Sequence, residues 1–163
     1  MPTLVSRIFL TGTVGEVSPT RCAVVERVRA WGVPLDDERA DVIRLVASEL
    51  VTNAVVHGEG PVTVGLYHRP GCLVIEVHDG NPGAPLVGTA GEEDERGRGI
   101  GLVTSFAARS GWEATERGKR VWAEITLPKP APAVRAAVLR RFFATRPSLD
   151  VRPAVLPFSL AVA

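Results

Sequence analysis

The sequence predicts an α+β fold, a two-layer sandwich in which helices cover one face of a mixed, mainly antiparallel sheet. The expected elements follow in the order strand, helix, helix, strand, strand, loop, helix, strand, strand, which does not fit a regular βαβ repeat. Of the 163 residues, 45% are hydrophobic and 23% are charged, which suits one globular domain. No apolar stretch reaches the roughly 20 residues of a membrane span. Cys22 and Cys72 form no metal-like cluster, so we expect a reduced, cytoplasmic setting.

Apolar periodicity and turn residues define the elements in chain order. Residues 4–10 are expected to form a first strand. Ser18 is expected as the N-cap of a first helix with Pro19 at its first position, and Gly32 is expected to end that helix.

A second helix is expected to begin at the acidic residues 36–38, because carboxylates suit the positive end of the helix dipole. It runs to His57, and Gly58 is expected as its C-terminal stop. Residues 62–68 and 72–79 alternate and are separated by a Pro-Gly turn, so they predict a hairpin.

The glycine-rich and acidic residues 80–99 predict a surface loop that could act as a lid. A short helix over residues 100–109 is expected next. Strands over 112–116 and 121–127, joined by a turn at 117–118, complete the sheet.

The C-terminal part differs in composition from the domain expected over residues 1–127. Residues 128–133 are proline-rich and predict a stiff linker to a basic and apolar extension, residues 134–163. Within the extension, residues 134–145 fit a short amphipathic helix that docks either on its own domain or on a partner or a membrane surface. Its basic residues are not interleaved with aromatic ones as in many nucleic-acid-binding segments, so no direct nucleic-acid contact is expected.

Two polar residues interrupt the apolar side of the second helix. On a helical wheel, Glu49 and Asn53 fall in the middle of the expected core face. The other members of that face are Val42, Leu45, Val46 and Val56. Burial of a carboxylate or an amide without a partner costs several kcal/mol, so the pair either faces a polar cavity, metal or ligand, or is satisfied by internal hydrogen bonds. At positions i and i+4 the two side chains can act on one ion.

Asp79 is the second candidate, because it ends the apolar row of Leu73, Ile75 and Val77. At the rim of the core its carboxylate can accept a hydrogen bond from an amino group of a ligand. The alternative is a structural role as the residue that initiates the turn after the strand.

Glycines at the start of the third helix form the third candidate. Gly97, Gly99 and Gly101 offer backbone N–H groups to phosphate oxygens, and Arg98 adds a positive charge. The spacing matches neither a Rossmann fingerprint nor a Walker A loop. A glycine-rich connector without a ligand is the alternative.

In this order, four stretches resemble the ATP-binding domain shared by histidine kinases, gyrase B and Hsp90. They are residues 49–57 (ELVTNAVVH), 77–79 (VHD), 97–102 (GRGIGL) and 118–122 (GKRVW). The likeness covers about residues 4–127 and is closer to the single-domain branch of anti-sigma factor serine/threonine kinases and related regulatory ATP-binding proteins of actinobacteria. It implies a Bergerat-type ATP-binding fold.

The resemblance also implies a role for each matched residue. Asn53 would ligate the Mg²⁺ that bridges the ATP phosphates, and Glu49 would be the general base. Asp79 would accept a hydrogen bond from the adenine amino group, and Gly83 would let the backbone pass close to the base. The phosphate-covering loop would comprise Gly97, Arg98, Gly99 and Gly101, and residues 88–96 would form the lid.

The implied activity is Mg-ATP-dependent phosphorylation of an antagonist (anti-anti-sigma) protein, sequestration of a sigma factor, or both. A homodimer is a further partner arrangement to consider. Two positions depart from the family pattern: Val56 stands where a basic residue is usual, and Asn81 stands where the wider superfamily has glycine. The alternative function is a non-catalytic protein-binding module of the same fold, with ATP as a structural ligand or with no ligand.

Overall fold

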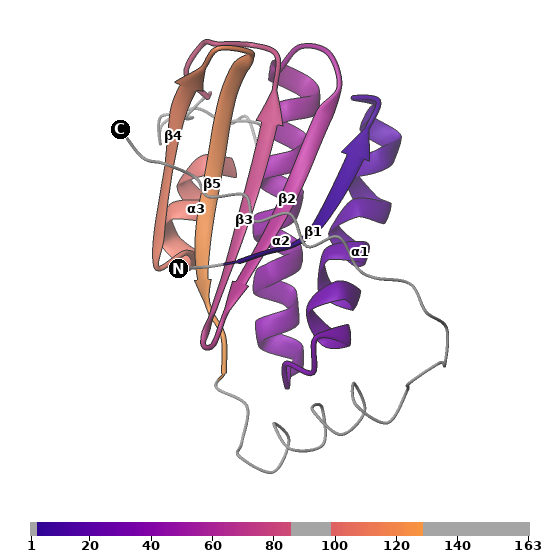
Figure 1. Ribbon diagram of the computed structural model, residues 1–163, viewed down its shortest axis with the longest axis vertical. Coiled ribbons are helices and arrows are strands. Elements are labelled where there is room, and N and C mark those ends of the chain that lie inside the picture. The colour runs from indigo at the N-terminus through magenta and orange to yellow at the C-terminus, as the bar shows by residue number, and fades with distance from the viewer. Residues whose placement is uncertain (1–2, 86–98, 129–163) are drawn as a thin grey trace, which may run out of the picture. The chain divides into compact units, whose positions relative to one another are not determined.

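The computed structural model describes residues 3–85 and 99–128, which form a two-layer α+β sandwich (Figure 1). All of them belong to the first, Met1–Ala131, of the two units into which the chain divides. The strands are β1 (Thr3–Leu10), β2 (Val62–Arg69), β3 (Cys72–Asp79), β4 (Arg109–Thr115) and β5 (Gly118–Thr126). The helices are α1 (Val17–Ala30), α2 (Asp37–His57) and α3 (Gly99–Phe106), with a 3-10 turn η1 (Val14–Glu16) before α1.

The five strands form one sheet in the order β1-β2-β3-β5-β4, and each neighbouring pair is antiparallel. The three helices cover one face of this sheet, and α2 contacts both α1 and α3 (Figure 1). The predicted fold class is therefore confirmed, with a sheet that is antiparallel throughout rather than mixed. Within the described residues, no helix has the length and apolar character needed to cross a membrane.

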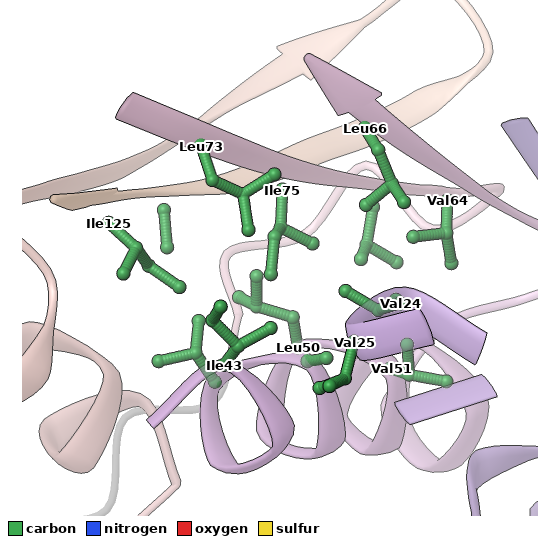
Figure 2. Packing of buried hydrophobic residues seen from close by; sticks show 14 of the residues in the cluster. Val24, Val25, Ile43, Leu50, Val51, Val64, Leu66, Leu73, Ile75 and Ile125 are labelled. Carbon is green, nitrogen blue, oxygen red and sulfur yellow. The ribbon is translucent and has the colours of Figure 1, made fainter. Parts of the chain in front are cut away.

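The hydrophobic core fills the space between the sheet and the helices, and α2 contributes its central apolar stripe. Figure 2 shows Ile43 and Leu50 of α2 facing Leu73 and Ile75 of β3. The buried apolar residues of α2 are Ala40, Ile43, Val46, Ala47, Leu50, Val51 and Ala54. This stripe is rotated from the expected core face, because Val56 is 51% exposed. The error arose because the expected face was centred on Glu49 and Asn53, whereas the helix directs the Leu50 side to the sheet.

The first helix begins at Val17, two residues before the predicted first position, Pro19, and follows directly on η1; its N-cap is Glu16 and not Ser18. Glu16 explains the difference. Its carboxylate accepts hydrogen bonds from the backbone N–H groups of Thr11 (3.1 Å), Gly12 (3.1 Å) and Thr13 (2.9 Å). These bonds hold the chain in a turn before the helix, so Ser18 is not needed as an N-cap. The predicted end of the helix is confirmed at Gly32, which has a φ of +78°.

The third helix is shorter than predicted, because it ends at Phe106 rather than at residue 109. The backbone N–H of Ala108 donates to the carbonyl of Glu124 on β5 (2.8 Å), so pairing with the sheet begins there. β4 consequently starts at Arg109, ahead of the predicted 112. The predicted extension, residues 134–163, and the predicted linker apart from Pro128 lie outside the described residues.

The hydrogen bonds at Glu16 predict a pH-dependent stability. Bonds from the backbone of Thr13 and Thr11 lower the pKa of Glu16 from 4.5 to about 2. The stabilisation is thus present above pH 4.5 and is lost as the pH falls toward 2. Glu16→Gln keeps an acceptor oxygen but does not titrate. We expect its melting temperature, measured by circular dichroism, to fall less between pH 7 and pH 3 than that of the wild type.

Glu116→Gln, in the β4–β5 turn, is the matched control. Its melting temperature should fall as much as that of the wild type over the same pH range. If the melting temperatures of the wild type and Glu16→Gln fall by the same amount, the role assigned to the Glu16 carboxylate is wrong.

Candidate functional site

Two buried apolar rows on the inner face of the sheet end in opposite charges. Their members are Leu73, Ile75 and Val77 on β3 and Ile125, Ala123 and Val121 on β5. The β3 row continues into Asp79, and the β5 row continues into Lys119. Because the antiparallel register pairs Asp79 directly with Lys119, the two charges meet at the same end of the sheet.

Asp79 and Lys119 form a buried ion pair. The Lys119 Nζ lies 2.9 Å from Asp79 Oδ1 and 3.4 Å from the carbonyl oxygen of Asn81. The side chains of Lys119 and Asp79 are 1% and 0% exposed. Loss of either partner would leave an uncompensated buried charge. Asp79 Oδ2, in contrast, is buried and has no hydrogen-bond partner in the part of the chain that the structure describes.

The turn after β3 is held by Asp79 Oδ1, the same oxygen that Lys119 contacts. Asp79 Oδ1 accepts from the backbone N–H of Asn81 (2.9 Å), so the turn-forming role considered from the sequence is present. Asn81 then links this turn to α2, because its Nδ2 donates to the carbonyl of His57 (2.9 Å). Its Oδ1 accepts from the N–H of Gly83 (2.8 Å), which places Gly83 in this exposed turn. In the described part of the chain, the structural contacts of Asp79 therefore use Oδ1 and not Oδ2.

Glycines allow the backbone to approach Asp79 closely. A Cβ on Gly118 would lie 1.9 Å from the Asp79 carbonyl oxygen, and Gly118 has a φ of +135° that other residues rarely adopt. A Cβ on Gly58 would lie 2.6 Å from Asp79 Cγ. Gly58 does end α2, but with an ordinary φ of −85°, so the left-handed stop that a C-terminal glycine usually supplies is absent. Glycine is needed at position 58 because a Cβ there would collide both with the carbonyl oxygen of Ala54 and with the side chain of Asp79.

Glu49 and Asn53 lie one turn apart on the C-terminal half of α2. Asn53 is 7% exposed, and its Oδ1 has no hydrogen-bond partner among the described residues. Glu49 is half-buried, and burial raises the pKa of its carboxyl group from the ordinary 4.5. A Cβ on Gly99 would lie 2.4 Å from Glu49 Oε2, so the Glu49 carboxylate lies against the first turn of α3. No hydrogen bond within residues 3–85 and 99–128 satisfies Asn53 Oδ1 internally.

The glycine motif lies only partly within the described residues. Gly99 and Gly101 are in the first turn of α3, whereas Gly97, Arg98 and the predicted lid, residues 88–96, lie outside. A Cβ on Gly101 would meet no heavy atom within 4 Å. Packing among the described residues therefore does not require glycine at position 101, which leaves room for a ligand to approach the backbone.

The described residues offer one oxygen donor that a magnesium ion accepts, Oδ1 of Asn53. No three His, Cys, Asp or Glu side chains of the described residues form a group that could hold a metal ion. Asn53 Oδ1 is a hard oxygen donor of the kind that Mg²⁺ accepts, and Mg²⁺ usually takes its other ligands from water and phosphate. The residues thus fit Mg²⁺ bound together with a nucleotide.

The sequence motif that includes Lys119 was identified, but no role was given to Lys119 itself. The strand period could have placed Lys119 in the core. Lys119 is two residues from Val121 in the row of every second residue that continues to Ala123 and Ile125, so its side chain lies on the same, buried face. Only the strand register, however, brings it opposite Asp79.

Comparisons with known proteins agree with this architecture. The crystal structure of the RsbU and RsbW domains of Rv1364c from Mycobacterium tuberculosis is similar, with a TM-score of 0.54 at 17% sequence identity. The similarity covers 78% of this chain and 34% of that one, so the matched part is about a third of that chain. No curated protein matches the sequence. A family model of the histidine kinase-like ATPase domain matches residues 12–125, well over half of the chain, and the chain therefore belongs to that family.

Proposed function

We propose that the chain binds Mg-ATP between the C-terminal half of α2, the end of β3 and the start of α3. The observation that carries the proposal is a pair of buried acceptor oxygens, Asn53 Oδ1 and Asp79 Oδ2, that have no hydrogen-bond partner in residues 3–85 and 99–128. Because buried polar atoms in folded proteins are almost always hydrogen-bonded, both oxygens are suited to groups of a ligand. The adenine amino group would donate to Asp79 Oδ2, and Asn53 Oδ1 would ligate Mg²⁺. Membership in an ATPase-domain family supports this assignment.

The proposed reaction is phosphorylation of a serine or threonine on an antagonist protein. The hydroxyl oxygen forms a bond to the γ-phosphorus of ATP, ADP leaves, and Glu49 accepts the hydroxyl proton. Burial raises the pKa of Glu49, which makes its carboxylate a stronger proton acceptor than an exposed one. Mg²⁺, when bound, supplies charge neutralisation, which together with positioning provides most of the catalysis in phosphoryl transfer.

The regulatory setting of the proposal rests on the sequence resemblance to anti-sigma factor kinases. In this setting the chain holds a sigma factor and releases it according to the state of the antagonist. The fold similarity to a structure that contains an RsbW domain is compatible with it.

A non-catalytic module is the second candidate, because apolar side chains are exposed near the proposed site. Val56, on the last turn of α2, is 51% exposed where the family usually has a basic residue. Leu102 and Phe106 are also exposed, one turn apart on α3. Such side chains favour contact with a partner protein. In this alternative ATP is a structural ligand or is not bound.

The first prediction concerns binding of ATP, measured by titration calorimetry with and without Mg²⁺. Wild-type protein should bind ATP more tightly with Mg²⁺. Asn53→Ala should bind with similar affinity in both conditions, because the metal loses its only protein ligand among the described residues. Asp79→Asn should bind at least about tenfold more weakly in both, because the adenine amino group loses a charged acceptor.

Asp41→Asn is the matched control, since Asp41 is on the same helix, exposed and paired with Arg44. It should bind like the wild type. If wild-type protein does not bind millimolar ATP, the proposed nucleotide site is wrong.

The second prediction concerns catalysis by Glu49. With γ-³²P-labelled Mg-ATP and a panel of anti-anti-sigma domains, we expect wild-type protein to label one domain on serine or threonine. Glu49→Gln should bind ATP with wild-type affinity and label that domain about 10²- to 10⁴-fold more slowly, the range that general bases contribute. Glu59→Gln, at an exposed position after α2, is the control and should retain the rate.

Unchanged labelling by Glu49→Gln would remove Glu49 from the reaction. ATP binding without labelling of any domain would favour the non-catalytic module.

A further inference from the structure

Among the residues that the structure describes, the ion pair at the end of the sheet has both an acceptor and a donor without a partner. A lysine ammonium carries three N–H donors. Lys119 directs one to Asp79 Oδ1 at 2.9 Å and a longer one, of 3.4 Å, to the carbonyl of Asn81. One donor of Lys119 is therefore not used within the described residues. On the carboxylate that Lys119 contacts, Asp79 Oδ2 is an acceptor to which no described residue donates.

This arrangement matches one edge of adenine. The 6-amino group of adenine donates a hydrogen bond, and the adjacent ring nitrogen N1 accepts one. Guanine presents the reverse order, because its O6 accepts and its N1–H donates. Enzymes that read a single base commonly do so through such hydrogen bonds to its Watson–Crick edge.

We propose that Lys119 is a base-reading residue, which donates to adenine N1 while Asp79 Oδ2 accepts from the 6-amino group. This inference rests on the proposed ATP site and adds to it the residue that selects adenine over guanine. Guanine would place O6 against the Asp79 carboxylate and N1–H against the Lys119 ammonium, so each contact would be repulsive.

A comparison with the neighbouring cation, Arg120, supports a role for Lys119 beyond that of a counter-ion to Asp79. Arg120, the next residue, points to the opposite face, where it lies near two carboxylates, those of Glu76 (3.5 Å) and Glu113 (3.3 Å). Within the described residues Lys119 contacts a single carboxylate, that of Asp79, and the backbone N–H of Asn81 donates to the same oxygen. The chain at Gly58 passes close to the Asp79 side chain, since a Cβ there would lie 2.6 Å from Asp79 Cγ. Since both groups are shielded from water, a base that does not pair with them leaves buried polar groups unsatisfied, and such sites discriminate strongly.

The test is a comparison of ATP with 1-deaza-ATP, in which a C–H group replaces N1. Affinities are measured by titration calorimetry in excess Mg²⁺. Wild-type protein should bind 1-deaza-ATP about 10- to 100-fold more weakly than ATP, the usual effect of one hydrogen bond to a charged group. Lys119→Met removes the donor, so it should bind the two nucleotides with nearly equal affinity. A purely structural role of Lys119 would change both affinities together and leave their ratio intact.

Arg120→Met is the matched control, because it removes a neighbouring cation from the opposite face and should keep the wild-type ratio. The wild-type comparison needs no variant, so the proposal stays testable even if Lys119→Met does not fold. Tight binding of ATP and 1-deaza-ATP with equal affinity by wild-type protein would overturn the role of Lys119 and leave the ATP site standing. Absence of binding by both nucleotides would instead refute the proposed function.

Discussion

The buried ion pair between Asp79 and Lys119 is the constraint on which the described structure depends most. Its two charges are removed from water, so each is tolerated only while the other stays within hydrogen-bond distance. This requirement fixes the register of β3 against β5, because a shift by one residue would turn one charge to the opposite face. Glycine stands at positions 58 and 118 beside Asp79: a Cβ at position 58 would collide with the Asp79 side chain and the Ala54 carbonyl, and one at position 118 with the backbone of Asp79 and Gly80.

The same pair joins the core to the site. The apolar rows of β3 and β5 pack against the Leu50 side of α2, which leaves the adjoining side of that helix, with Glu49 and Asn53, to face the site. Asn81 ties the turn after Asp79 to the end of α2, so the end of the sheet and the end of the helix are held together. Stability and the position of the polar groups therefore come from one set of contacts.

The sequence predicted the order of the elements and the fold class, because helix and strand periods, acidic first turns and glycine turns are local signals. It identified Asp79 because a carboxylate ended an apolar row. The core face of α2 was misjudged, since its apolar residues extend around much of the helix and only contact with the sheet selects the Leu50 side. The roles of Lys119 and Gly58 depend on strand register and on a close approach between distant segments, which local patterns do not specify.

The most direct measurement is the free energy of unfolding in urea of wild-type protein, Asp79→Asn, Lys119→Met and the double variant, each with and without Mg-ATP. We expect each single variant to lose about 3–5 kcal/mol and the double variant to lose much less than the sum, because it contains no unpaired buried charge. Mg-ATP at a hundredfold excess over its Kd should stabilise the wild type by about 2.7 kcal/mol and the variants by less. Additive losses, with equal stabilisation by Mg-ATP in all four proteins, would contradict the account that one ion pair both closes the core and forms the nucleotide site.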